Sequence, residues 1–265
     1  MLGKMIKHEF IATGRSFLPM YIFMIILTPV FSLIMRLCHE NSKDFGIINI
    51  LGGLSIFGFI VMMIGIFMAS FILIVVRFYQ TTATSEAYLT FTLPVSTHHI
   101  ILSKLLAAIV WQLLSGVLML ACILVMSFIT GILSPADFVD GLQHYLPLIS
   151  DELPKSYWFL FPTMLAVGAI SGTLQYYCSI MLGQLFRDHR IIGSIGVYLA
   201  LSTITQIISS VAIFPIMFVI ADAEGNISNS YDIIIFTIGI LLSLVFGVVY
   251  YFATSYVMKR RLNVQ

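Results

Sequence analysis

The side chains best suited to nucleophilic or metal chemistry are three cysteines and two adjacent histidines. Cys38, Cys122 and Cys178 are widely spaced and odd in number, and two of them lie inside apolar runs. This pattern predicts small buried hydrophobes rather than a disulfide framework or a metal cluster. His98 and His99 are neighbours, and adjacent residues on a helix point about 100° apart, so the pair is poorly placed to share one ion. We therefore expect no metal site.

Six long stretches contain no Asp, Glu, Lys, Arg or His. They run over residues 17–35, 45–76, 105–130, 156–186, 191–221 and 233–258. Ion-coupled carriers generally place ionisable groups in the membrane, and intramembrane metalloproteases need a motif such as H-E-x-x-H. Neither feature is present, and the chain has no G-x-x-x-x-G-K-[ST] phosphate-binding loop. The sequence therefore predicts no enzyme activity, no catalytic residues and no cofactor, and any nucleotide hydrolysis would belong to a partner.

The composition indicates what surrounds these stretches. Hydrophobic residues make up 60% of the 265 residues, whereas charged residues make up only 9%. A soluble domain carries about 25% charged residues, which cover its surface, and a helix of about 20 apolar residues crosses a bilayer. We expect an all-α integral membrane protein with six transmembrane helices, forming a single transmembrane domain over residues 1–265. The net charge of +1 gives no support for nucleic-acid binding.

The charges in the connections predict the topology. With six spans, the N-terminus, the 77–104 and 187–190 loops and the C-terminus share one side. That side holds ten of the 13 cations and three of the 12 acidic residues, which gives it a net charge of +7 and leaves −6 for the other. The positive-inside rule assigns the basic side to the cytoplasm. Both termini are therefore expected there, with the first stretch retained as an uncleaved span.

Other segments carry local signals. Residues 2–15 place Leu2, Met5, Ile6 and Phe10 at helical spacing away from the lysines, which predicts an amphipathic helix in the inner interface and in contact with membrane lipid. The alternative for this segment is a frayed basic tail. The 131–155 loop has three prolines and four carboxylates, enough for a small extracellular cap.

Prolines and glycines mark further features of the spans. Helices that exceed 25 residues must tilt, extend beyond the lipid or break, and Pro162 and Pro215 are the break points expected under the last alternative. A segment that folds back into the membrane near Pro215 stays an open alternative. Small residues at intervals of four in the fourth and sixth stretches predict close approach of helix backbones. These residues are Gly168, Gly172, Gly239, Ser243 and Gly247.

The 77–104 loop is the largest cytoplasmic connection. Thr84 or Ser85 can cap a short helix, Glu86 suits its first turn, and Pro94 ends it. Ser96 or Thr97 then offers a second cap, from which the third span starts. The short helix would present apolar side chains to the membrane surface or to a groove on a partner. These side chains are Tyr88, Leu89, Phe91 and Leu93.

The string Glu86-Ala-Tyr-Leu-Thr-Phe-Thr-Leu-Pro-Val-Ser, followed by Ile101-Leu-Ser-Lys104-Leu-Leu, resembles the segment between the second and third spans of ABC-2 type permeases, most of all those of Gram-positive bacteria. The topology is similar along the whole chain, whereas the motif covers about 20 residues. In that family the segment is a coupling helix that sits in a cleft of a separate ATPase subunit. Many relatives have Glu-Gly where this chain has Glu86-Ala87.

The resemblance implies a permease subunit of an ATP-binding-cassette exporter in a bacterial cell membrane, moving an amphipathic or hydrophobic substrate. Its partners would be ATPase subunits, which bind ATP and Mg²⁺, and a second copy or a sibling permease. The ATPase-coupling residues would be Glu86, Ala87, Tyr88, Leu89, Phe91, Leu93 and Pro94. Two alternatives stay open: a receptor or scaffold that binds a ligand through its external loop, and a channel.

Overall fold

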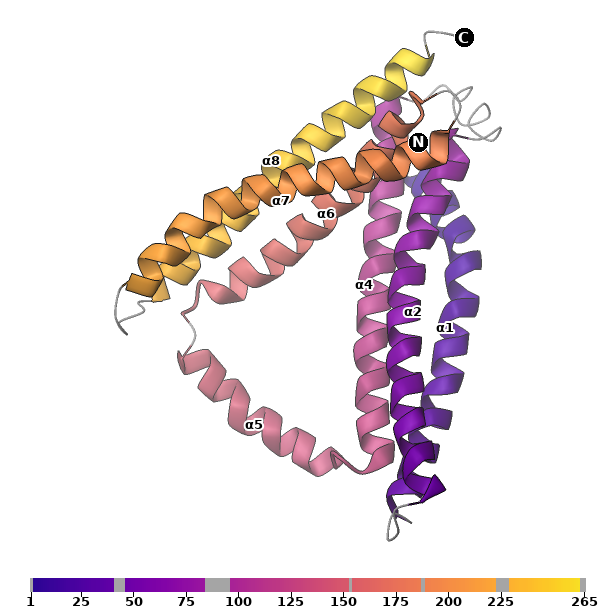
Figure 1. The fold of residues 1–265 in the computed structure, drawn as a ribbon, viewed down its shortest axis with the longest axis vertical. Helices are drawn as coiled ribbons and strands as arrows, with labels where there is room; N and C mark the ends of the chain where they lie inside the picture. The colour runs from indigo at the N-terminus through magenta and orange to yellow at the C-terminus, as the bar shows by residue number, and fades with distance from the viewer. Residues whose placement is uncertain are drawn as a thin grey trace. The chain divides into compact units, whose positions relative to one another are not determined.

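The computed structural model describes residues 2–40, 46–83, 96–152, 154–186, 189–222 and 229–262. These ranges contain seven helices and no strand (Figure 1). Six of the helices are long and apolar enough to cross a membrane, so the chain is an all-α, multi-pass membrane protein. The helices are α1 (Leu2–Glu40), α2 (Ile47–Ala83), α4 (Thr97–Thr130), α5 (Pro135–Glu152), α6 (Tyr157–Gly183), α7 (Arg190–Asp222) and α8 (Asn229–Leu262).

The N-terminal segment is helical as expected, but it is not a separate helix. Residues 2–15 continue into the first span, and α1 runs for 39 residues through Pro19 and Pro29. One apolar side chain of this segment contacts α4: Phe10 stacks on Trp111 with ring centroids 5.0 Å apart, and Phe17, in the following turns of α1, does the same. The helix therefore has contact with protein at Phe10, and its position at the membrane interface stays a prediction.

The helices do not break at the two prolines where a break was expected. Both α6 and α7 continue past Pro162 and Pro215, and α7 reaches Asp222. Pro162 lies in the second turn of α6, where the ring meets few preceding carbonyls. Proline is tolerated inside spanning helices because neighbouring groups satisfy the freed carbonyl.

The 131–155 loop contains a helix, α5, for which the sequence analysis gave no prediction. The α5 helix starts at Pro135, a favoured residue for the first helical position. Ser134 and Asp137 form a reciprocal capping box: the Asp137 N–H donates to Ser134 Oγ at 3.0 Å, and the Ser134 N–H donates to Asp137 Oδ2 at 3.2 Å. Gly131, at φ +75°, ends α4 in a conformation that favours glycine.

The chain divides into two compact units, and residues 6–76 with 110–149 form one of them. Its apolar core is rich in methionine, which fills irregular gaps, and comprises Met24, Phe59, Met62, Met63, Ile66 and Cys122. Hydroxyl groups join three helices there. The Tyr21 hydroxyl lies 2.6 Å from Ser115 Oγ, and Ser70 Oγ lies 3.2 Å from the same oxygen. These bonds connect α1, α2 and α4 where water is excluded.

Residues 1–5, 77–109 and 150–265 form the other unit. Its centre is α6, which packs along both α7 and α8 (Figure 1). Gly247 on α8 faces Ser171 on α6, and a Cβ added at Gly247 would lie 3.6 Å from Ser171 Cβ, whereas Gly168, Gly172 and Gly239 face open space. The small-residue pattern is thus used at one of its predicted positions.

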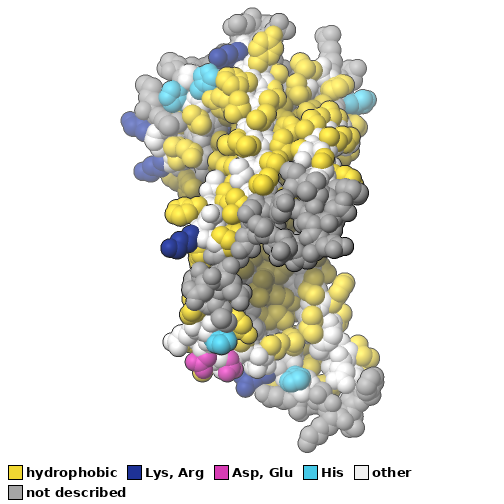
Figure 2. Space-filling model, turned by 90° about the vertical axis from the view of Figure 1, so that its left-hand side faces the viewer, with side chains coloured by type: hydrophobic (Ala, Val, Ile, Leu, Met, Phe, Trp, Pro, Cys, Tyr) yellow, Lys and Arg dark blue, Asp and Glu magenta, His cyan; other side chains and the backbone are white. Residues whose placement is uncertain are grey.

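The described surface is largely apolar, as lipid contact requires. Hydrophobic side chains dominate the face shown in Figure 2, where charged side chains are few. Large side chains such as Leu120 and Phe159 are 64% and 79% exposed. A soluble monomer rarely exposes contiguous apolar surface on this scale, whereas hydrocarbon covers it without loss.

The α6–α7 turn supplies a stability prediction. A Cβ on Gly183 would overlap the backbone of Ser194, and two backbones have little freedom to separate. We expect Gly183→Ala to destabilise the protein by about 1–3 kcal/mol, the usual range for overpacking, measured by thermal unfolding in detergent. Gly196→Ala is the matched control, since its added Cβ meets nothing within 4 Å. Equal stability of the two variants would contradict the close approach.

Candidate functional site

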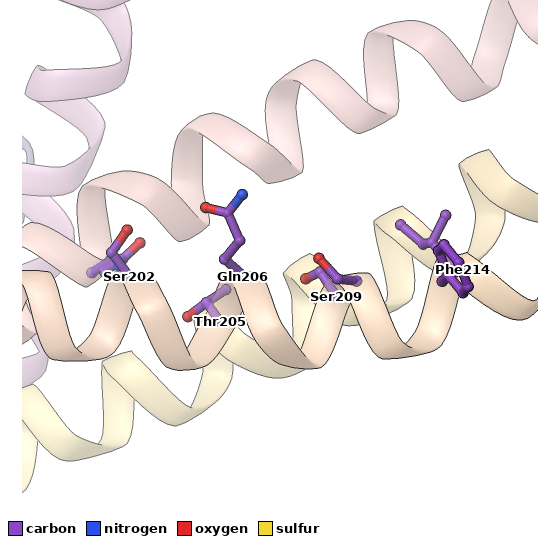
Figure 3. A pocket seen from close by; sticks show the side chains of 8 residues that line it. Ser202, Thr205, Gln206, Ser209 and Phe214 are labelled. Atoms are coloured by element: carbon purple, nitrogen blue, oxygen red, sulfur yellow. The ribbon is translucent and has the colours of Figure 1, made fainter.

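One face of α7 is polar between Ser202 and Ser210, although the helix contains no charged residue between its ends. Ser202, Thr205, Gln206 and Ser209 follow i, i+3, i+4, i+7 spacing, which places them on one side of the helix. Figure 3 shows this row, with the Gln206 side chain extending toward α6. The polar groove along the row has a volume of about 480 Å³. Its lining is Gln175, Ser202, Thr205, Gln206, Ser209, Ser210, Ile213 and Phe214.

Placing the polar groove against lipid would cost free energy. Gln206 lies midway between Arg190 and Asp222 and is exposed, whereas Gln175 on α6 is half-buried. Removing an amide from water without a hydrogen-bond partner costs roughly 2–7 kcal/mol. Ser and Thr avoid this cost by bonding to their own helix, but a glutamine amide carries two N–H donors and a carbonyl. Water, a substrate or another polar protein surface is therefore the favourable neighbour of this face.

Thr205 connects the groove to α8. Its hydroxyl donates to the carbonyl of Leu201 at 2.7 Å and lies 2.5 Å from the hydroxyl of Tyr250. Thr205 has a single hydroxyl hydrogen, so Tyr250 is the donor in the second bond. This bond fixes α8 against the polar face of α7.

The predicted coupling residues, Glu86 to Pro94, lie outside the described residues. The helices on either side of them are described: α2 ends at Ala83 and α4 begins at Thr97. The predicted start of the third span is confirmed, because the Ser96 carbonyl accepts the N–H of His99 at 3.0 Å. Lys104, counted from sequence as a loop cation, is buried at 6% exposure within α4.

The end of α2 is fixed to α6 by an aromatic stack. Phe78 and Tyr177 lie nearly parallel at 9°, with ring centroids 3.8 Å apart, and each is 1% exposed. Thr82 donates to the Phe78 carbonyl at 2.6 Å, which binds the last turn of α2 to the same point. Buried aromatic pairs of this kind contribute about 0.5–1.5 kcal/mol beyond area burial.

The start of α4 is fixed to α8 by His98. Its Nδ1 lies 2.6 Å from the hydroxyl of Tyr251, and its Nε2 lies 3.3 Å from Nζ of Lys259. An ammonium group only donates, so Nε2 accepts and Nδ1 carries the proton. His98 is thus half-buried and bonded at both ring nitrogens, whereas His99 is exposed and contacts Ser96.

These two attachments lie close in sequence to the polar groove. Tyr177 is two residues after Gln175 on α6, and Tyr251 follows Tyr250 on α8. Each helix therefore contacts one flank of the 84–95 segment and also contributes a side chain at or beside the groove. All of these residues belong to one compact unit.

The side chains that line the polar groove include no cysteine and no histidine. Cys122 and Cys178 are buried, Cys38 is half-buried, and all three are free. Over the described ranges, no three His, Cys, Asp or Glu side chains gather where they would hold a metal ion.

Comparisons with protein-family models, curated proteins and solved structures return no significant match. The residues of the polar groove were missed at the level of sequence. The signal that would have found them is the helical spacing of Ser202, Thr205, Gln206 and Ser209 inside a stretch treated as uniformly apolar.

The Thr205–Tyr250 bond is testable by a double-mutant cycle. We expect Thr205→Val and Tyr250→Phe each to destabilise the protein in detergent, with a coupling energy of about 0.6–1.7 kcal/mol, the span measured for hydrogen bonds between membrane helices. Thr203→Val serves as the control, because Thr203 is exposed and its hydroxyl donates within α7, to the carbonyl of Leu199. Additive effects of Thr205→Val and Tyr250→Phe would show that the two hydroxyls do not interact.

Proposed function

We propose that the chain is the permease subunit of an ATP-binding-cassette exporter in a bacterial cell membrane, paired with a second permease and with separate ATPase subunits. The observation that supports the proposal most is that the polar groove and the flanks of the 84–95 segment lie in one compact unit. The polar groove follows one face of the spanning helix α7, and the helices that line or border it, α6 and α8, contact both flanks of the segment that resembles a coupling helix.

In this proposal the polar groove is the surface along which substrate passes. Its hydrogen-bonding groups are uncharged, and Ile213 and Phe214 add an apolar end. Such a lining suits an amphipathic molecule, whose polar part bonds to hydroxyl and amide groups while its apolar part meets the hydrophobic end. A second permease placed over α7, the least buried of the six spans, would enclose the passage.

In this proposal the free energy of ATP binding and hydrolysis would reach the permease through the 86–94 segment. Closure of the ATPase subunits on ATP would displace this segment, and the Phe78–Tyr177 stack and the His98–Tyr251 bond would carry the displacement to α6 and α8. Packed aromatic and hydrogen-bonded contacts transmit motion as discrete rearrangements rather than gradual deformation. The Thr205–Tyr250 bond would then move the polar face of α7.

The test is reconstitution with any ATP-binding-cassette ATPase encoded beside the gene. A stable complex that moves an amphipathic probe across proteoliposomes in an ATP-dependent manner is the result expected. A complex without flux would favour the receptor or scaffold, in which α5 belongs to the ligand-binding external part. No complex at all would remove the basis of the permease proposal.

The coupling residues have their own prediction. Leu89→Asp and Phe91→Asp should each weaken recovery of the ATPase with the permease by at least about tenfold, because a carboxylate would enter an apolar cleft. The measurement is quantitative co-purification from detergent-solubilised membranes. Leu89→Met, which conserves volume, should bind normally, and unchanged melting temperatures would show that the spans remain folded. Normal recovery with both aspartate variants would refute the coupling assignment.

A further inference from the structure

A second groove, separate from the polar one, lies between α6 and α8. It has a volume of about 210 Å³ and an almost wholly apolar lining. Small residues on both helices, Ser171, Ser243 and Gly247, form its floor where the backbones approach, and Ile170, Val248 and Tyr251 form part of its wall. The depression exists because no larger side chain fills it. In a bilayer, an open apolar groove of this kind meets hydrocarbon.

This apolar groove ends beside cationic and hydrogen-bonding groups. Tyr251 lines the groove, and its hydroxyl lies 2.6 Å from Nδ1 of His98. Nε2 of His98 lies 3.3 Å from Nζ of Lys259. Lys259 is exposed and follows Tyr251 by about two turns of α8, or about 12 Å along the helix. The contact with His98 uses one of the three N–H donors of the ammonium group.

The charge around this end is basic. Arg260 and Arg261 follow Lys259 in the sequence, and the positive-inside rule assigns this end of α8 to the cytoplasmic leaflet. A cation at the surface of the cytoplasmic leaflet attracts anionic lipid headgroups. The adjoining apolar groove offers room for a hydrocarbon chain attached to such a headgroup.

We propose that the α6–α8 groove and the His98–Lys259 pair form a binding site for one anionic phospholipid of the cytoplasmic leaflet. An acyl chain occupies the apolar groove, and the headgroup phosphate accepts hydrogen bonds from Lys259. The charge complementarity and the continuity between groove and cationic end favour this occupant over a neutral lipid. Because His98 also holds the start of α4, the bound lipid steadies one flank of the 84–95 segment.

The experiment is native mass spectrometry of the full-length protein released from detergent with added lipid. Phosphatidylglycerol and phosphatidylcholine with the same acyl chains are titrated separately. We expect the first adduct of phosphatidylglycerol to form at about fivefold lower concentration, the factor associated with one cation near an anionic headgroup. Lys259→Gln should remove this preference, and Lys7→Gln, a change at another exposed basic position, should leave it intact.

The apolar groove is tested by filling it. Gly247→Leu should weaken the first adduct of both lipids, whereas Gly168→Leu, at an exposed glycine outside the groove lining, should not. Equal binding of the two lipids by the native protein, or an undiminished preference in Lys259→Gln, would overturn the proposal. Displacement of phosphatidylglycerol by millimolar inorganic phosphate would also overturn it, since it would assign the cationic end to a free anion.

Discussion

The hydrocarbon core of a bilayer offers no partner to a polar group, and this constraint governs the structure. Most hydroxyl groups in the spans meet it locally: Thr28 donates to the carbonyl of Met24 and Ser70 to that of Ile66, each one turn back. A glutamine amide has more donors and acceptors than such a bond uses. The exposed Gln206 is therefore the side chain whose position demands an explanation, and it lies at the middle of the polar groove.

The same constraint explains how the unit around α6 is joined. Its helices are joined by hydrogen bonds as well as by packing. The bonds include Thr205 with Tyr250, His98 with Tyr251, and Tyr176 with Tyr198, and the Phe78–Tyr177 stack is an example of close packing. These contacts connect the flanks of the 84–95 segment to the helices that line or border the polar groove.

The spans were predictable because the exclusion of charged residues from hydrocarbon leaves a clear pattern in the sequence, and each of the six charge-free stretches coincides largely with one long helix. The features that the sequence did not predict depend on helix caps or on contacts between residues far apart in the chain. The reciprocal bonds of Ser134 and Asp137 cap the start of α5, a helix that the sequence analysis did not predict. The stack of Phe10 on Trp111 joins residues that are far apart in the sequence. The Thr205–Tyr250 bond joins residues 45 positions apart, which no local period reveals.

The central claim is that the polar face of α7 meets water or substrate rather than lipid, and cysteine accessibility tests it directly. With Cys38, Cys122 and Cys178 replaced by alanine, a single cysteine is introduced by Gln206→Cys or by Ile207→Cys, since Ile207 is 56% exposed on the same helix. Membranes are then treated with a charged, membrane-impermeant thiol reagent, which reacts with the thiolate form that water supports. The account predicts labelling in Gln206→Cys and protection in Ile207→Cys. Protection of both, or equal labelling, would contradict it.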